Sequence, residues 1–300
     1  MEYLKLITEN RNPESMRLDG MSSLEIAELM NRLDADIPAA VEKALPEIAE
    51  TAERIAGAFR NGGRLIYAGA GTSGRLGVLD AAECLPTFGA GKDMVDAVIA
   101  GGEAAMLRAV EGAEDSEELG MADMRSLSLC EKDALVVVSA SGSAAYCRGA
   151  LSYARSAGAF TAGVCCVAEP AFAPLCDVIM SAVVGPEILT GSTRLRAGTA
   201  TKMILNMLST ISMVRFGKVY ENLMADMIPT NKKLSDRTVR ILQMATGLSR
   251  EEAEKKLSEC GDAKTAIVSA KAGVGAGEAK EALKEEQGIV RRAIRRMEKK

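Results

Sequence analysis

Residues 67–76 read Tyr-Ala-Gly-Ala-Gly-Thr-Ser-Gly-Arg-Leu, and this stretch decides the fold class. It begins at the end of a short apolar run, residues 64–68, and leads into a stretch with helical spacing from about Ser73 to Cys84. A buried strand, a glycine-rich turn and a helix, in that order, form the opening of a parallel α/β unit. Further apolar runs of strand length are residues 96–100, 133–139, 159–165 and 177–184. Strands that alternate with helices predict a three-layer α/β/α arrangement around a parallel sheet, with ligands beyond the carboxyl ends of the strands.

Helical sequence flanks this α/β region on both sides. On the N-terminal side, Ser22 and Glu25 form a capping-box pair, and a further helix is expected from about Pro38 to Phe59. On the C-terminal side, an amphipathic helix over residues 199–216 precedes charged, helical sequence. The predicted regions are an N-terminal helical segment (1–60), an α/β ligand-binding domain (61–218) and a C-terminal helical domain (219–300).

The most informative absence is histidine. The chain contains none, which excludes a Ser-His-Asp triad, a Cys-His dyad and histidine metal sites. Acid–base chemistry must therefore use Glu, Asp, Lys, Tyr or Cys. The 7 cysteines are irregularly spaced, with no C-x-x-C pair, so we interpret them as core thiols and predict no metal site.

The composition also indicates which kinds of partner and which cellular compartment to expect. A net charge of −4, no Trp, and only 5 Tyr and 5 Phe argue against a nucleic-acid-binding surface. Residues 1–5, Met-Glu-Tyr-Leu-Lys, lack the basic start of a secretory signal, and no charge-free apolar run is long enough for a membrane span. We therefore expect a cytoplasmic protein with no nucleic-acid or membrane partner.

The glycine-rich stretch favours a phosphate over a nucleotide. It contains G-x-G-x-x-G, but the next predicted strand ends Ile-Ala-Gly-Gly at residues 99–102, without the acidic residue that holds a ribose. Arg75 and Leu76 stand where a Walker A loop needs Lys and Ser or Thr. The remaining interpretation is a phosphate cradle at a helix N-terminus. Its predicted members are Gly71, Thr72, Ser73 and Gly74.

A second hydroxyl-rich loop follows the clearest strand, residues 133–139. Its predicted ligand-binding members are Ser139, Ser141, Gly142 and Ser143. Ordinary turn chemistry would explain either loop alone. Two such loops on neighbouring strands suit a phosphomonoester, with the rest of a small polar ligand extending away.

The first candidate acid or base is Glu83. Leu76, Leu79 and Glu83 share one face of the helix that follows the first loop. Burial of this face would raise the pKa of the Glu83 carboxyl toward neutrality, as general acid–base catalysis requires. The alternative is a helix-end glutamate whose carboxylate reaches water before Pro86.

Other polar residues are candidates for the same site. Glu114 lies in an acidic segment, residues 111–118, which by itself reads as a solvated loop. Glu187 and Ser192 follow the last predicted strand, so they too are candidates to face the ligand.

Several long motifs give the chain a resemblance to N-acetylmuramic acid 6-phosphate etherases. The motif at residues 69–84, Gly-Ala-Gly-Thr-Ser-Gly-Arg-Leu-Gly-Val-Leu-Asp-Ala-Ala-Glu-Cys, is the longest of them. Shorter matching segments lie at residues 8–12, 86–89, 100–102, 114–115, 185–187, 191–194, 197–200 and 205–206. The resemblance extends over nearly the whole chain.

The resemblance implies a sugar isomerase (SIS) domain, a cytoplasmic homodimer and an amino-sugar 6-phosphate substrate. It also implies a lyase reaction that releases D-lactate from C3 and leaves N-acetylglucosamine 6-phosphate, without a metal or other cofactor. By resemblance, Glu83 donates a proton to the departing lactate and Glu114 is the second acid/base. Glu187 is held in reserve, because related SIS isomerases place a proton-transferring glutamate in a similar Gly-Pro-Glu context.

The second loop departs from the family pattern. The family usually reads Ser-Gly-Arg-Thr-Pro-Tyr there, whereas residues 141–146 read Ser-Gly-Ser-Ala-Ala-Tyr. Loss of the threonine hydroxyl at Ala144 is expected to weaken phosphate binding about 10- to 100-fold unless Ser143 substitutes. The alternatives are a phosphosugar-binding regulator without turnover, as in the related glucokinase regulatory protein, and an SIS-type aldose–ketose isomerase, which would release no lactate.

Overall fold

The chain folds as two compact units in a computed structural model that describes residues 7–227 and 232–299. Helices α4 and α8 contribute residues to both units, so this division does not test the boundaries predicted after residues 60 and 218. The expectation about residues 1–5 concerns part of the chain outside the described residues. The first unit comprises residues 1–82 and 92–209, and the second comprises residues 83–91 and 210–300.

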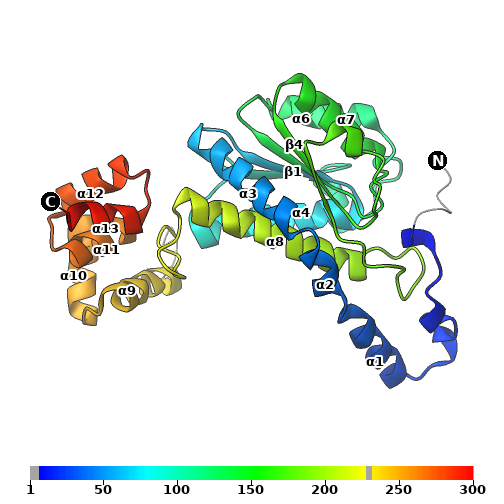
Figure 1. Cartoon of the computed structure of the whole chain (residues 1–300), viewed down its shortest axis with the longest axis horizontal. Coiled ribbons are helices and arrows are strands. Elements are labelled where there is room, and N and C mark those ends of the chain that lie inside the picture. Colours follow the sequence, from blue (N-terminus) through cyan, green and yellow to red (C-terminus); the bar gives the residue numbers. More distant parts are fainter. Residues whose placement is uncertain (1–6, 228–231, 300) are drawn as a thin grey trace. The chain divides into compact units, whose positions relative to one another are not determined.

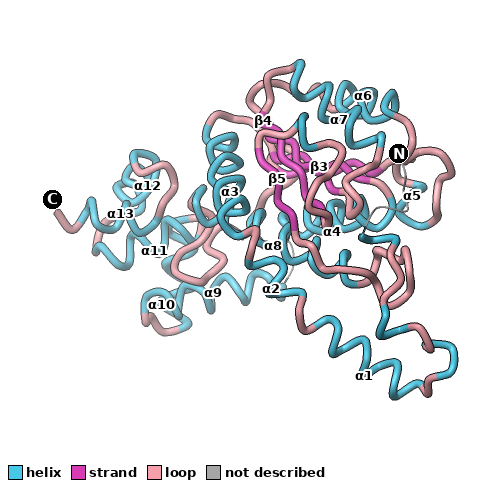
Figure 2. The backbone as a smooth tube through the Cα atoms, turned by 45° about the vertical axis from the view of Figure 1, so that its right-hand side comes forward, coloured by secondary structure: helices cyan, strands magenta, loops and turns pink. Residues whose placement is uncertain are grey.

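A five-stranded parallel sheet forms the centre of the first unit, in the order β2-β1-β3-β4-β5. Its strands are magenta in Figure 2. The strands are β1 (Leu65–Gly69), β2 (Val95–Ile99), β3 (Ala134–Val138), β4 (Phe160–Cys165) and β5 (Val178–Ser181). Each corresponds to an apolar run of the sequence, so the predicted parallel α/β fold is confirmed. β1 and β3 are neighbours, with Gly69 opposite Val138, so the loops that follow these strands leave the sheet side by side.

Helices cover both faces of the sheet (Figure 1). The capping box predicted at Ser22 is present: its N–H donates to Glu25 Oε2 over 2.7 Å, and Glu25 N–H donates to its hydroxyl. The single helix expected from Pro38 to Phe59 is instead two, because a new helix starts with Pro46 in its first turn. The helices are α1 (Ser23–Asp34), α2 (Ile37–Glu42), α3 (Leu45–Arg60), α4 (Gly71–Phe88), α5 (Ala104–Leu107), α6 (Glu117–Ser126), α7 (Ala145–Ser156) and α8 (Arg196–Phe216).

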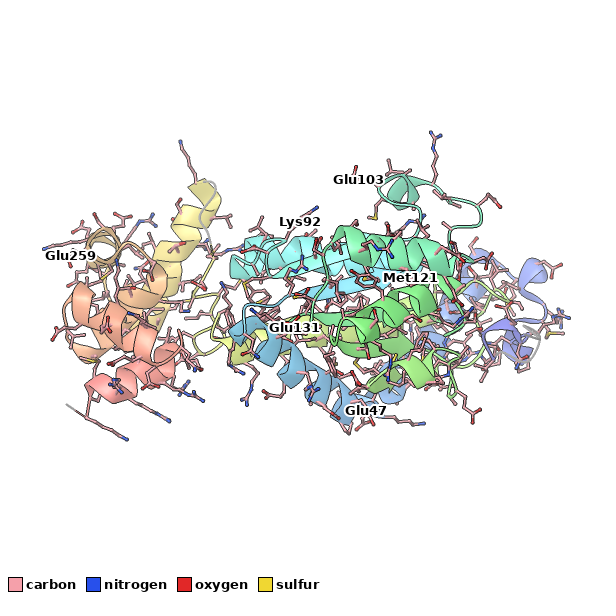
Figure 3. The ribbon with its side chains drawn as sticks, turned by 90° about the horizontal axis from the view of Figure 1, so that it is seen from above. Glu47, Lys92, Glu103, Met121, Glu131 and Glu259 are labelled. Carbon is pink, nitrogen blue, oxygen red and sulfur yellow. The ribbon has the colours of Figure 1, made fainter. Side chains whose placement is uncertain are left out.

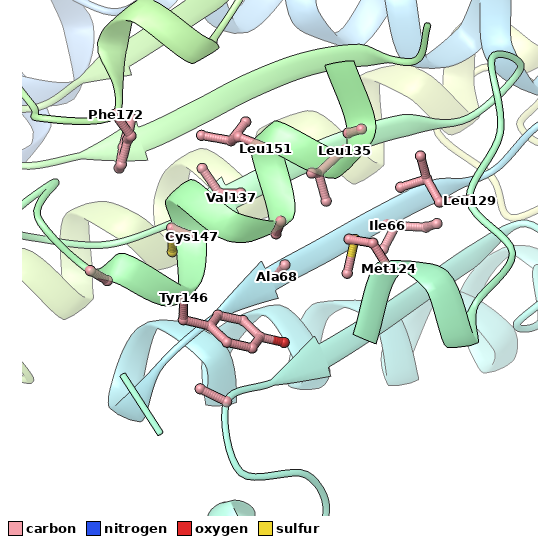
Figure 4. Close-up of a cluster of buried hydrophobic side chains, with 14 of the residues drawn as sticks. Ile66, Ala68, Met124, Leu129, Leu135, Val137, Tyr146, Cys147, Leu151 and Phe172 are labelled. Carbon is pink, nitrogen blue, oxygen red and sulfur yellow. The ribbon is translucent and has the colours of Figure 1, made fainter. Parts of the chain in front are cut away.

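Helices α6 and α7 pack on one face of the sheet through a dry core (Figure 4). Ile66, Leu135 and Val137 of the strands meet Met124 of α6 and Leu151 of α7, and all five are fully buried. The two helices also approach each other closely. A Cβ on Gly120 would clash with the backbone of Tyr146, and one on Gly149 with the backbone of Glu117. This close packing fixes the start of α6 against the start of α7.

A buried polar cluster ties β1, α4 and α8 together on the opposite face. Asp80 of α4 accepts hydrogen bonds from Tyr67 Oη (2.9 Å), Asn206 Nδ2 (2.7 Å) and Ser209 Oγ (3.2 Å). Desolvation raises the pKa of the Asp80 carboxyl, although these hydrogen bonds oppose that shift. A carboxylate with several donors is well satisfied when buried, so the cluster holds α4 and α8 in register with the sheet.

The second unit is helical. Its core includes Leu242, Ile267, Val268 and Val290, and Ser249 and Glu252 form a capping box at the start of one helix. The turn expected at residues 273–277 separates two helices. The helices of this unit's C-terminal part are α9 (Lys232–Thr246), α10 (Arg250–Cys260), α11 (Ala263–Ala272), α12 (Ala276–Glu285) and α13 (Val290–Met297).

The surface carries charged side chains, including Lys92, Glu103 and Glu131 (Figure 3). Within residues 7–227 and 232–299, no helix combines the length and the apolar character that a membrane crossing requires.

Candidate active site

A cavity of about 270 Å³ lies beyond the carboxyl ends of β1 and β3, within the first unit. The loop after β1 supplies residues 70–73 to it, and the loop after β3 supplies most of the rest. Among the described residues that line it, none is Lys or Arg. The predicted residues that line it are Gly71, Thr72, Ser73, Glu114, Ser139, Ser141 and Ser143, and those that do not are Gly74, Glu83, Gly142, Glu187 and Ser192.

The first loop turns directly into α4. Gly71 has a positive φ of 54°, and Gly74 N–H closes the first turn by donating to Ala70 O over 3.1 Å. The N–H groups of Thr72 and Ser73 therefore belong to the first helical turn, where no earlier carbonyl accepts them. Together with the two hydroxyls and the positive end of the helix dipole, they suit an anion in the cavity.

The second loop presents a chain of hydroxyls. The Oγ atoms of Ser141 and Ser143 are 2.7 Å apart, and those of Ser139 and Ser141 are 3.5 Å apart. Gly142 makes the turn with a φ of 66°, and a Cβ there would clash with Pro170. The glycine is therefore required by the loop's shape and does not line the cavity.

The start of α7 faces the same cavity. Ala144, the N-cap residue, lines the cavity and has no side chain that could accept from the first-turn N–H groups. Arg148 NH1 donates to Ser143 O over 2.8 Å and holds the loop against the helix. Ser143 and Ala144 both line the cavity, so the Ser143 hydroxyl is next to the position where the family pattern has a threonine.

Glu114 brings a carboxyl to the cavity. Its carbonyl oxygen accepts from Tyr146 N–H over 3.0 Å, and Ser116 then caps α6 by accepting from Leu119 N–H. Desolvation raises the pKa of the Glu114 carboxyl, and the negative charge of Asp115 raises it further. Glu114 is exposed, as a solvated acidic segment implies, but it also lines the cavity together with the two hydroxyl-rich loops.

Glu187 has a structural position instead. It is 1% exposed, and its two carboxylate oxygens accept from Arg196 N–H and Ala197 N–H, each over 2.9 Å. Burial raises the pKa of its carboxyl, while these two hydrogen bonds oppose the shift. Glu187 thus caps α8 and does not reach the cavity. Ser192 also misses the cavity, but the next residue, Thr193, lines it.

Glu83 lies on α4, exposed, and away from the cavity lining. It is twelve residues along α4 from Gly71, which corresponds to about 18 Å of helix. Leu79, on the same face, is 53% exposed, so the expectation that this face is buried is wrong for the chain by itself. α4 instead buries Asp80 and Cys84.

Two further residues line the cavity without having been assigned a role from the sequence. Thr193 belongs to the segment 191–194, and Glu9 to the polar segment 8–12. Both segments matched the family motifs, which is the signal that could have identified them. Within the described residues, no three Cys, Asp or Glu side chains lie close enough together to hold a metal ion.

A larger cavity, of about 660 Å³, lies in the second unit between residues 222–224 and α9. It contains neither a predicted carboxylate nor a phosphate-binding loop. We therefore assign the candidate active site to the cavity of the first unit.

Comparisons with known proteins identify the fold and the family. Residues 47–155 match the family described as the glucokinase regulatory protein N-terminal SIS domain. A phosphoheptose isomerase from Francisella tularensis has a similar fold, with a TM-score of 0.52 at 18% identity, over 65% of this chain and 100% of that one. The fold predicted from the sequence is therefore confirmed as that of a SIS domain.

The curated relatives are similar over almost their full length. An N-acetylmuramic acid 6-phosphate etherase from Photorhabdus laumondii is 50% identical over 290 residues, which is 96% of each chain. One from Serratia proteamaculans is 52% identical over 292 residues, covering 97% of this chain and 98% of the relative. This chain belongs to the N-acetylmuramic acid 6-phosphate etherase family.

Proposed function

We propose that this chain cleaves the C3 D-lactyl ether of N-acetylmuramic acid 6-phosphate and releases D-lactate and N-acetylglucosamine 6-phosphate. The observation that carries the proposal is the cavity in which two phosphate-binding loops meet a carboxyl with a raised pKa. The family membership adds the substrate, since the relatives carry the name of this activity.

The reaction proceeds by elimination and hydration. The sugar ring opens to an aldehyde, which acidifies the proton on C2. A carboxylate removes that proton, the C3–O bond breaks, and an acid protonates the departing D-lactate. Water then adds its hydroxyl to C3 and its proton to C2, which yields N-acetylglucosamine 6-phosphate.

The residues of the cavity divide between binding and catalysis. The hydroxyls of Thr72, Ser73, Ser141 and Ser143, together with the N–H groups of Thr72 and Ser73, bind the 6-phosphate without a cationic side chain. Glu114 takes the proton from C2, since its raised pKa makes it a stronger base than an ordinary glutamate. The phosphate thereby anchors the substrate while the carboxyl acts on the carbon chain.

Glu83 acts on the cavity of a second copy of the chain in a homodimer. Its carboxyl does not line the cavity of its own chain, yet it stands on an exposed face of α4, four residues from Leu79, which is 53% exposed. This face is therefore open to a second chain. In this arrangement Glu83 donates the proton to the departing lactate.

The reaction takes place in the cytoplasm in this proposal. All seven cysteines are free thiols, and five of them are buried. Unpaired thiols in apolar surroundings are typical of a reducing compartment.

The Ser143 hydroxyl is expected to contribute directly to phosphate binding. Ser143→Ala should weaken binding of N-acetylglucosamine 6-phosphate about 10- to 100-fold, because one hydrogen bond to a charged group is worth about 1.5–3 kcal/mol. Isothermal titration calorimetry measures this, with Ser156→Ala, at the far end of α7, as the control. An unchanged dissociation constant for Ser143→Ala would remove Ser143 from the phosphate site.

Asp115 is expected to set the pH dependence of the reaction through the pKa of Glu114. Its negative charge raises the pKa of Glu114, so Asp115→Asn should lower that pKa. Because Glu114 acts when deprotonated, the acidic limb of the kcat/KM–pH profile should move to lower pH. Glu111→Gln, in the same segment, should leave the limb in place. A limb that stays in place in Asp115→Asn would show that it does not report the ionisation of Glu114.

The match to the regulatory protein's SIS domain favours one alternative, a phosphosugar sensor without turnover. Release of D-lactate from N-acetylmuramic acid 6-phosphate by the purified protein separates the two functions. A sensor would bind the sugar phosphate and release none.

A further inference from the structure

A carboxylate that the mechanism above does not use stands on the wall of the active-site cavity. Glu9 ends a short 3₁₀ turn, Ile7–Glu9, and lines the cavity together with Glu114 and the two serine- and threonine-rich loops. Its Oε2 atom would be 3.1 Å from a Cβ placed on Gly191, so the carboxylate lies against the backbone of the segment that also contributes Thr193.

The segment that carries Glu9 is fastened to the rest of the unit. Thr8 is fully buried. Asn12 is 4% exposed, donates from Nδ2 to Pro186 O over 3.2 Å, and accepts from Glu14 N–H through its own side chain. These contacts hold residues 8–12 against the loop that precedes α8. Glu9 is therefore presented to the cavity by anchored neighbours on both sides.

The Glu9 carboxylate is available to a ligand. Across residues 7–227 and 232–299, no hydrogen bond or ion pair engages it, whereas the Glu14 carboxylate in the same segment pairs with Arg32 at 2.8 Å. An ionised carboxylate only accepts hydrogen bonds. It repels a phosphate and attracts hydroxyl and amide N–H donors, so it cannot belong to the phosphate-binding part of the site.

We propose that Glu9 is a specificity-determining residue that accepts hydrogen bonds from the sugar's hydroxyl and amide N–H groups while the serine and threonine loops hold the phosphate. The inference rests on the proposed function for the identity of the ligand as an amino-sugar 6-phosphate. It gives the ligand an orientation in the cavity. The phosphate lies against the hydroxyl and N–H groups of the two loops, and the hydroxyl and N–H groups of the sugar lie against the Glu9 carboxylate.

The experiment compares two ligands by isothermal titration calorimetry: N-acetylglucosamine 6-phosphate and inorganic phosphate. Glu9→Gln keeps the size of the side chain and removes its charge, so it should weaken binding of the sugar phosphate about 10- to 100-fold. Binding of inorganic phosphate should be unchanged or tighter, since a negative charge is lost. Glu14→Gln is the matched control and should leave both affinities unchanged.

A second variant moves the carboxylate without removing it. Gly191→Ala places a methyl group against Glu9 Oε2 and also strains the backbone, which has a φ of 76° there. It should weaken binding of the sugar phosphate more than binding of inorganic phosphate. Equal losses for both ligands in Glu9→Gln would overturn the proposal in favour of a structural role, as would a sugar-phosphate affinity within about twofold of wild type. These experiments measure binding and do not depend on lactate release. The role of Glu9 can therefore be tested even if the chain does not cleave the ether.

Discussion

Replacement of Glu114 by glutamine is expected to lower the rate of D-lactate release about 10²- to 10⁴-fold, the usual contribution of a general acid or base. Glutamine keeps the shape of the side chain but cannot take a proton from C2. The raised pKa of Glu114 and its place on the cavity wall are the grounds for this size of effect. Initial rates of lactate release at saturating substrate measure it.

The control for this variant is Glu118→Gln, four residues along and exposed. It should retain wild-type turnover, and Glu114→Gln should still bind N-acetylglucosamine 6-phosphate. Turnover by Glu114→Gln above about a tenth of the wild-type rate would contradict the assignment of Glu114 as the base.

Glu83→Gln is expected to cause a loss of similar size, about 10²- to 10⁴-fold, by removing the proton donor for lactate. Glu114 lines the cavity of its own chain, whereas Glu83 is exposed on α4 and does not line that cavity. In the homodimer that we propose, a donor placed there completes the cavity of the other copy.

Mixing the two inactive variants tests this arrangement. After subunit exchange, half of the dimers pair Glu83→Gln with Glu114→Gln, and one of the two cavities in each is intact. Activity should then return to roughly a quarter of the wild-type value. Each variant exchanged with itself is the control. A mixture as inactive as its parents would show that Glu83 does not complete the partner's cavity.

The sequence predicted the fold because buried parallel strands leave a clear pattern. Each strand is a short apolar run, because helices cover both faces of the sheet and leave few strand residues in contact with water. The meeting of the two hydroxyl-rich loops was predictable for the same reason: the loops directly follow β1 and β3, which pair along their length. Placing Thr72, Ser73, Ser139 and Ser141 at one cavity therefore needed no knowledge of distant contacts.

The remaining cavity residues depend on contacts that no local pattern shows. Glu114 lies in an acidic segment that reads as solvated, and it is indeed exposed, but the backbone hydrogen bond from Tyr146 N–H at the start of α7 holds it at the cavity wall. Glu9 is placed by a contact between Asn12 and Pro186, which are 174 residues apart in the chain. Glu187 was a candidate from the sequence but does not line the cavity. A glutamate that follows a strand can contact a ligand or cap a helix, and only the hydrogen bonds of the structure show that Glu187 caps α8.

The most direct test of the proposed etherase activity is the measurement of D-lactate release from N-acetylmuramic acid 6-phosphate by the purified wild-type chain. We expect D-lactate and N-acetylglucosamine 6-phosphate in equal amounts, with no release by Glu83→Ala. Binding of the sugar phosphate without any release of lactate would contradict the proposed activity, and would make this chain a sensor or an isomerase on the same fold.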